Sequence, residues 1–349
     1  MKIQKKELAQ KLNKVKMAVP KKPIQAVLQG VLVKDGYLIG NNLETTIKAK
    51  LEGTEGECFI IPERAFDLIN NLPDGEVDIS LTSKDTITIK ADRIKNKYQT
   101  MDSAQFPIIS AWEDGNELAI DAEVLLESMK RVSYAIPAQG TNAAMNTMCL
   151  QATEGQLNFV GLDGHVLAWD KVDYDGEFQL LIPKNTVEKI KSLGITGEVR
   201  IKHNKMQALF VTEEYEIYTR LIEGQYFKYK NMFNKLPLHT VISRENLLEA
   251  ITRAKMCTDE LKPVRFEIQG SSLNLSIRDN TTNYDETVDL QEEFSEKLVI
   301  GFNAKLVMET LKAFDCENVG ITFGGAKMPM IVEAEDSDFK AIVLPVAME

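Results

Sequence analysis

The sequence predicts an α+β fold built from three similar domains, each containing two units of one helix followed by antiparallel strands. Three observations lead to this prediction. Amphipathic helical patterns occur six times, they begin at intervals of about 60 residues, and the segments between them alternate apolar and polar residues around turn dipeptides. The 349 residues, of which 44% are hydrophobic, are sufficient for two or three domains with cores of their own.

The six helical windows each place apolar residues at i, i+3, i+4 and i+7, which is typical of a helix that buries one face. Asp121 and Ser243 have side chains preferred at a helix N-cap. Pro62 and Pro183 suit the first helical turn, where a missing N–H costs nothing. The expected helices span, in chain order, residues 5–19, 62–72, 121–136, 183–194, 243–258 and 302–315.

The segments between the helices favour hairpins, because Asp-Gly and Glu-Gly pairs suit tight turns. These pairs are Asp35-Gly36, Glu154-Gly155, Asp163-Gly164 and Asp175-Gly176. An apolar strand runs directly into the second, fourth and sixth helices, whereas the odd-numbered helices lack this entry, so the units pair into three domains. With linkers in the polar loops WEDGNE and NKLPLH, we expect the domains to span 1–117, 118–239 and 240–349.

The charge distribution is uneven. The chain has 41 Lys and Arg against 52 Asp and Glu, and this net charge of -11 taken alone argues against a polyanionic partner. The six helical windows nevertheless sum to +5, which leaves −16 on the rest of the chain. Either the solvated helix faces are simply Lys-rich, or one helical surface faces a polyanion. The segment Lys2–Lys22, with eight Lys and one Glu, favours the second interpretation.

The sequence contains no recognisable catalytic motif. It lacks a phosphate-binding loop, a dinucleotide-binding glycine motif and a nucleophile elbow. Its three His and four Cys are spaced unlike a metal site or a disulfide framework. No apolar run predicts a membrane span or a secretory signal. We therefore expect a cytoplasmic scaffold without catalytic residues, metal or cofactor.

Five segments in order carry a family resemblance: GLDGHVLAW, LIPKNTVEKIKSLG, LIEGQYFKY, IGFNAKLVMETLKAFDCENVGITF and AIVLPV. They are similar to the bacterial DNA polymerase III beta subunit, the sliding clamp, and the resemblance extends over the whole chain. It implies the DNA clamp fold and a head-to-tail homodimer closed into a ring, with helices lining a central pore and sheets outside. Such a ring encircles double-stranded DNA and confers processivity on the replicative DNA polymerase without catalysis of its own.

The resemblance also implies contacts with DNA that do not read the bases. Lys22, Arg64 and Gln139 match family positions that contact DNA, and we expect Lys184 on the fourth helix to do the same. Two aromatic residues usual beyond Gln139 are replaced here by Ala143 and Ala144, which argues against a stacking contact with single-stranded template.

The family has an apolar groove that binds short linear motifs. The motifs belong to polymerases, the clamp-loader ATPase complex and repair proteins. Leu162, Val166 and Asn231 replace polar family residues, so we expect a more apolar groove. The resemblance places this groove on Met145, Leu162, Gly164, His165, Val166, Leu167, Phe227, Met232, Val343, Leu344, Pro345 and Val346.

The ring seam is expected to join the fifth helix to the last strand of the first domain. Met256 and Cys257 lie on one side, and Tyr98 and Met101 lie on the other. The alternative is a monomeric peptide-binding scaffold that does not encircle DNA. A more remote alternative is an enzyme whose site lies among hairpin carboxylates.

Overall fold

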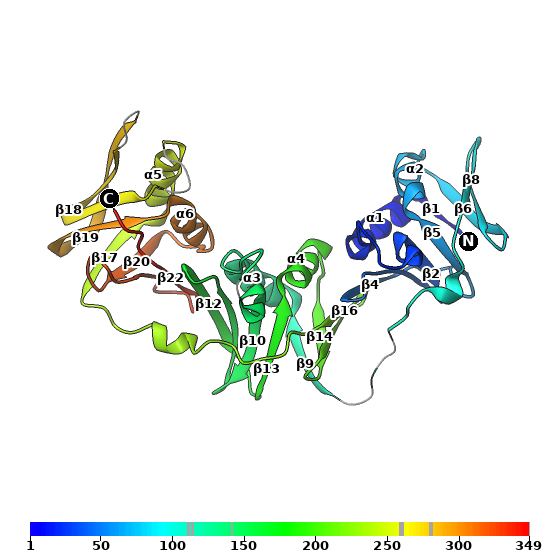
Figure 1. Ribbon diagram of the computed structural model, residues 1–349, viewed down its shortest axis with the longest axis horizontal. Coiled ribbons are helices and arrows are strands. Elements are labelled where there is room, and N and C mark those ends of the chain that lie inside the picture. Colours follow the sequence, from blue (N-terminus) through cyan, green and yellow to red (C-terminus); the bar gives the residue numbers. More distant parts are fainter. Residues whose placement is uncertain (110–111, 113–114, 141, 258–261, 279–281, 349) are drawn as a thin grey trace. The chain divides into compact units, whose positions relative to one another are not determined.

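Each α-helix follows a strand in the chain. The computed structural model describes residues 1–109, 112, 115–140, 142–257, 262–278 and 282–348. Within this part of the chain there are six α-helices, and the residues group into two compact units (Figure 1). Unit 1 comprises residues 1–126 and 188–221, and unit 2 comprises residues 127–187 and 222–349.

Unit 1 contains two antiparallel sheets among its described residues. The smaller has the order β1 (Lys2–Gln4), β6 (Glu76–Ser83), β7 (Thr86–Ala91) and β8 (Ile94–Gln99). The larger has the order β5 (Cys58–Pro62), β2 (Gly30–Lys34), β3 (Tyr37–Asn41), β4 (Thr45–Lys50), β16 (Tyr215–Arg220), β15 (Gln207–Val211), β14 (Glu198–His203) and β9 (Asn116–Asp121). Because β4 pairs with β16, this sheet joins segments of the predicted first and second domains.

Unit 2 contains one long sheet within the described chain. Its order is β13 (Phe178–Pro183), β10 (Thr147–Thr153), β11 (Gln156–Leu162), β12 (Val166–Asp173), β22 (Lys340–Val343), β21 (Met330–Glu333), β20 (Asn318–Phe323), β17 (Leu238–Ser243), β19 (Asn283–Phe302) and β18 (Val264–Arg278). Here β12 pairs with β22, so the sheet joins the predicted second and third domains.

The helices match five of the predicted windows closely and the second only in part. They are α1 (Lys5–Val15), α2 (Phe66–Asn71), α3 (Ala122–Ser133), α4 (Lys184–Leu193), α5 (Arg244–Met256) and α6 (Ala304–Lys312). The second window begins with a 3₁₀ turn over Glu63–Ala65 before α2 starts. Helices α3 and α4 each begin in one unit and end in the other. The division into three domains stays a prediction.

The odd-numbered helices also follow strands, but these strands lack the continuous apolar run that enters the even-numbered helices. Strands β1, β9 and β17 run directly into α1, α3 and α5. Their buried residues alternate with more exposed ones, or most of their residues are exposed, whereas β5 and β13 each contain at least three consecutive buried residues. A half-exposed strand has polar residues on one face, so it gives no continuous apolar run in the sequence.

Two of the predicted turns form two-residue hairpin connections. Asp35 and Gly36, and likewise Glu154 and Gly155, all have positive φ, as the type I′ turn requires. The Asp175-Gly176 pair instead lies in the longer loop between β12 and β13.

Helix α1 packs closely on its sheet because a glycine lies beneath it. A Cβ atom on Gly40 of β3 would lie 2.5 Å from the carbonyl oxygen of Val15. Gly161 of β11 lies in the same way against the carbonyl oxygen of Val132, in α3. The close approach lets Leu8 and Leu12 of α1 become fully buried, which contributes about 1.5–3 kcal/mol for each side chain.

We expect Gly40→Ala to destabilise the protein by about 2 kcal/mol, because the new methyl group must displace the backbone of α1. The control is Gly197→Ala. A Cβ atom at Gly197 would meet no atom within 4 Å, but the residue has a φ of +73°. This substitution should therefore lower the free energy of unfolding by only about 1 kcal/mol. Urea denaturation followed by circular dichroism measures both. Equal losses for the two variants would contradict the proposed close packing.

Candidate nucleic-acid interface and peptide-binding site

Helices α1 and α2 form one helical layer in unit 1 (Figure 1). The side-chain amides of Asn13 and Asn70 join them through reciprocal hydrogen bonds of 2.9 and 3.2 Å. Helix α1 buries Leu8 and Leu12 toward the sheet and leaves Lys6 exposed on its other side. The exposed side of this layer is therefore available to a partner.

The lysines of α1 do not all belong to that exposed side. Lys11 is only 14% exposed, and its ammonium group donates to the carbonyl oxygen of Lys50 and forms an ion pair of 2.9 Å with Glu214. The ammonium group of Lys14 donates to the carbonyl oxygen of Ser192 at 2.5 Å. These two cations stabilise contacts inside unit 1, so the positive charge counted from the sequence overstates what a polyanion would meet.

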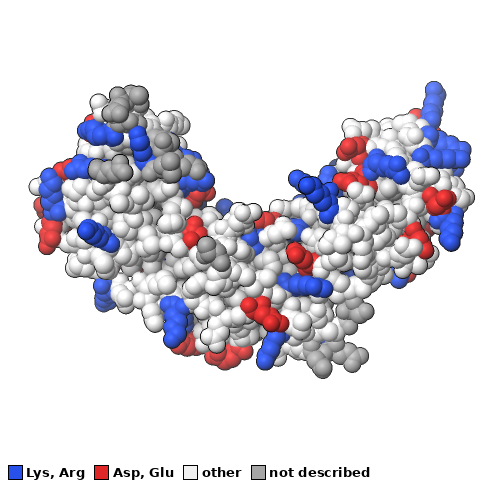
Figure 2. All heavy atoms as spheres, viewed as in Figure 1, with Lys and Arg blue, Asp and Glu red and all other residues white. Residues whose placement is uncertain are grey.

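The predicted DNA-contacting residues divide between the units. In unit 1, Lys22 is exposed in the loop before β2, and exposed Arg64 donates to the carbonyl oxygen of Gln99 at 3.3 Å. Figure 2 shows Lys and Arg side chains gathered over the part of unit 1 that contains α2 and β8. In unit 2, Gln139 is exposed, and half-buried Lys184 donates to the carbonyl oxygen of Ile136.

Two segments meet at the predicted peptide site in unit 2, namely the turn between β11 and β12 and the C-terminal segment that includes β22. The turn between β11 and β12 is held by Asp163, whose carboxylate accepts hydrogen bonds from the backbone N–H groups of His165 and Val166, both at 2.8 Å. The pairing of β12 with β22 places Val343 opposite Val166. The N–H of Leu344 then donates to the carbonyl oxygen of His165 at 2.8 Å. The C-terminal segment therefore lies beside this turn.

An apolar cluster contacts these segments. Its buried members are Ala144, Cys149, Val160, Leu162, Leu167, Leu181, Tyr226, Tyr229, Ile331 and Ile342. Partly buried side chains pack against it, namely Met145, Trp169, Ile222, Phe227, Phe233 and Leu236. We call these residues together the apolar cluster of unit 2.

The structure brings several predicted groove residues together but buries others. Leu162, Leu167, Met145 and Phe227 belong to the apolar cluster of unit 2. Gly164 and His165 are exposed in the turn, Met232 and Leu344 are 44% and 38% exposed, and Pro345 and Val346 are half-buried. Val166 and Val343 are only 2% and 0% exposed, so they contribute packing inside the sheet.

Sequence reasoning missed an aromatic group in the same cluster. The ring of Trp169 packs edge-on against Tyr229, with centroids 5.5 Å apart, and tilted against Phe233 at 5.2 Å. Tyr229 also donates to the side-chain oxygen of Gln151 at 2.9 Å. The aromatic-rich run YFKYKNMF at 226–233 is the signal that could have identified them.

The cluster carries no charge at neutral pH. Burial raises the pKa of the Cys149 thiol and of the Tyr226 and Tyr229 phenols, so all three keep their protons. Beside the cluster, Lys230 of the run 226–233 forms an ion pair of 2.6 Å with the exposed side chain of Glu154, in the turn between β10 and β11. Apolar side chains of a partner are the natural ligands of such a surface.

Other kinds of site do not emerge from the described part of the chain. In it, no group of three or more His, Cys, Asp or Glu side chains is arranged to hold a metal ion. Among the same residues, no helix has the length and apolar character that crossing a bilayer demands.

The four predicted seam residues also divide between the units. Tyr98 in β8 and Met101 just after it are half-buried in unit 1. Met256, the last residue of α5, is 80% exposed in unit 2, and Cys257 after it is half-buried. Strands β8 and β18 are the terminal strands of their sheets in the described structure.

Family models match almost the whole chain. The N-terminal, central and C-terminal domains of the DNA polymerase III beta subunit match residues 1–110, 119–228 and 235–347 respectively. The chain belongs to the DNA polymerase III beta subunit family. Its members include the beta sliding clamp of Proteus mirabilis, which is 23% identical over 99% of both chains. The beta sliding clamp of Vibrio cholerae is 24% identical over 88% of this chain and 86% of the relative.

Solved structures of the same family share the fold. The sliding clamp of Bacillus subtilis matches with a TM-score of 0.93 and 19% identity over 100% of this chain and 99% of that one. A sliding clamp from Pseudomonas aeruginosa, solved bound to griselimycin, matches with a TM-score of 0.93 and 24% identity over the same shares. The predicted α+β clamp fold is thereby confirmed.

Reversing the charge of Lys22 and Arg64 together should weaken binding of duplex DNA. Because each residue would contact a phosphate, the slope of log affinity against log salt should fall in magnitude by about 2. Fluorescence anisotropy with a labelled duplex at several salt concentrations measures this slope. The matched control reverses the charge of Lys84 and Lys205, two exposed lysines in hairpin turns. Equal slopes for the two double variants would exclude Lys22 and Arg64 from the interface.

Proposed function

We propose that this protein is a DNA sliding clamp that acts as a closed homodimeric ring around duplex DNA. The observation that carries the proposal is the match of three consecutive family domains along the chain, together with a clamp fold at a TM-score of 0.93. The ring confers processivity on the replicative DNA polymerase and has no catalytic activity. It works in the cytoplasm, at the nucleoid.

The mechanism follows from topology. A closed ring stays on DNA because it is linked to it, so the protein needs no tight contact with any one sequence. Exposed Lys22 and Arg64 attract phosphates without reading bases, and Gln139 and Lys184 add polar contacts. A polymerase tethered to the ring remains at high effective concentration near the primer end, which is the physical basis of processivity.

Ring closure requires a second copy of the chain. Strands β8 and β18 each have one unpaired edge in the described structure, and an unpaired edge favours addition of another strand. Tyr98 and Met101, in and just after β8, and Met256 and Cys257, at the end of α5, supply apolar contacts for the seam, and α5 packs against β18. Two such seams related by a two-fold axis close the ring and leave neither edge free.

The apolar cluster of unit 2 is the proposed docking site for partners. Short linear motifs of the replicative polymerase, of the clamp-loader ATPase complex and of repair proteins place apolar side chains against it. Leu162 stands at a family position that is usually polar and belongs to this cluster, which suits a strongly apolar motif. The monomeric scaffold remains the competing function, because it would use the same cluster without a ring.

Retention on DNA separates these two functions. After loading by its clamp loader, the protein should remain on a nicked circular plasmid during gel filtration and leave the same plasmid once it has been cut to a linear form. A topological link predicts this difference, since a ring slides off an open end. Equal retention on both forms, or on neither, would support the monomeric scaffold.

Replacing Leu344 and Pro345 together by Ala should weaken binding of a synthetic polymerase-derived peptide by about tenfold or more, because apolar contact area is lost. Isothermal titration calorimetry measures the affinity. The control is Met206→Ala, which removes a 65% exposed apolar side chain from unit 1. Wild-type affinity in the double variant would place the docking site elsewhere.

A further inference from the structure

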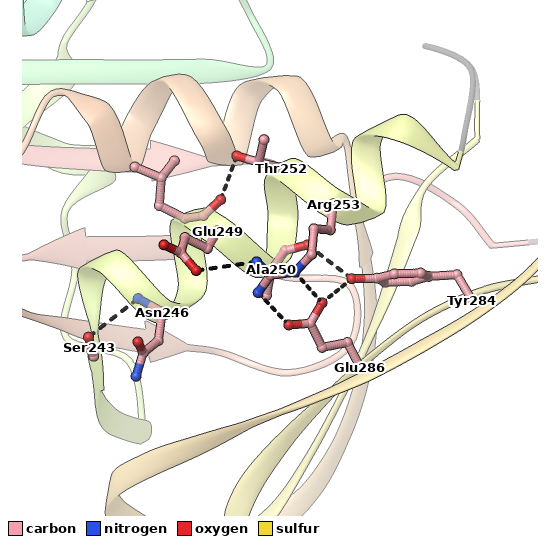
Figure 3. Close-up of polar contacts among 9 residues, drawn as sticks. Ser243, Asn246, Glu249, Ala250, Thr252, Arg253, Tyr284 and Glu286 are labelled. Atoms are coloured by element: carbon pink, nitrogen blue, oxygen red, sulfur yellow. Dashed lines mark hydrogen bonds and ion pairs between the residues drawn. The ribbon is translucent and has the colours of Figure 1, made fainter.

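A polar network joins the C-terminal half of α5 to strand β19 (Figure 3). The guanidinium group of Arg253 contacts both carboxylate oxygens of Glu286, with its Nε 3.1 Å from Oε2 and its second terminal nitrogen 2.6 Å from Oε1. The other terminal nitrogen lies 3.2 Å from the carboxylate of Glu249, one turn earlier in α5. Arg253 is therefore held by two carboxylates at once.

Tyr284 completes this network. Its hydroxyl donates to the Glu286 carboxylate and lies 3.3 Å from the carbonyl oxygen of Ala250 in α5. The hydrogen bonds from Arg253 lower the pKa of Glu286, and Tyr284 adds to this effect, so the carboxylate is ionised at neutral pH. Two side chains of β19 thus bind two successive turns of α5.

The network connects two parts of the proposed ring seam. Met256, 80% exposed, ends α5 only three residues after Arg253. Glu286 stands directly opposite Leu275 in the register of β18 and β19, and β18 is the terminal strand of its sheet in the described structure. The exposed methionine and the unpaired strand edge are therefore linked through Arg253 and Glu286.

The exposure of these residues argues against a mainly stabilising role. The Arg253 side chain is 49% exposed and that of Glu286 is 24% exposed. Solvent-exposed ion pairs contribute little to the free energy of folding. A two-pronged contact between guanidinium and carboxylate nevertheless fixes the relative orientation of the two elements that carry it.

We propose that the Arg253–Glu286–Tyr284 network is a positioning element for ring closure, which holds Met256 at a fixed place relative to the edge of β18 so that a second copy can engage both together. The proposal rests on the sliding-clamp function proposed above. In it, Arg253 acts through Met256 and β18 and does not itself need to touch the partner copy.

The test compares dimer affinity with folding stability. We expect Arg253→Ala to raise the dimer dissociation constant about tenfold, measured by sedimentation velocity over a dilution series. The thermal midpoint should shift by no more than about 2 °C. Arg253→Lys keeps the charge but loses the two-pronged contact, so it should also weaken the dimer. The charge-exchange variant Arg253→Glu with Glu286→Arg, made together with Glu249→Gln to avoid a like-charge pair in α5, should restore much of the affinity.

The control variant is Lys340→Ala. It removes another half-exposed ion pair, in which Lys340 of β22 lies 2.8 Å from Glu333 of β21, and should leave dimer affinity unchanged. Wild-type affinity in Arg253→Ala would overturn the positioning role alone. A fall in thermal midpoint large enough to explain the weaker dimer would also overturn it. A wild-type chain that stays at 39.2 kDa at high micromolar concentration would overturn the ring, and the positioning role with it.

Discussion

Antiparallel strand pairing between distant parts of the chain is the constraint on which the rest of this structure depends. Strand β4 pairs with β16, so Ile47 lies opposite Ile217, and β12 pairs with β22, so Val166 lies opposite Val343. Each pairing satisfies backbone groups that would otherwise form an open edge. Because both pairings cross predicted domain borders, the compact units do not coincide with the repeated units of the sequence.

Both candidate sites follow from these long sheets. The pairing of β12 with β22 carries the C-terminal segment to the turn at His165, where the apolar cluster of unit 2 is exposed in part. The pairing of β4 with β16 brings Glu214 within reach of Lys11 on α1. The same backbone contacts that build the sheets thus decide which charges are neutralised internally and which remain for a partner.

Much of the candidate site could be predicted from the sequence, although some of its residues could not. The motif GLDGHVLAW and the terminal AIVLPV identified the turn and the C-terminal segment, whereas Trp169 inside the first motif was not recognised as a packing centre. Its contacts with Tyr229 and Phe233 bridge about 60 residues of chain, and no periodic pattern reports contacts at such a separation. The burial of Val166 was equally invisible, because an apolar residue in a strand can face either side of the sheet.

The local elements and the family can be predicted from the amino-acid sequence. Apolar residues at helical spacing specify helices wherever one face can be buried, and Asp-Gly and Glu-Gly pairs specify tight turns, since both signals act over a few residues. The tertiary structure alone decided which strands pair across the repeat, which lysines of α1 become internal, and that Arg253 meets Glu286. Lys14 and Ser192 are 178 residues apart and Arg253 and Glu286 are 33 apart. Contacts over such distances depend on how whole sheets pack, and no local pattern in the chain encodes them.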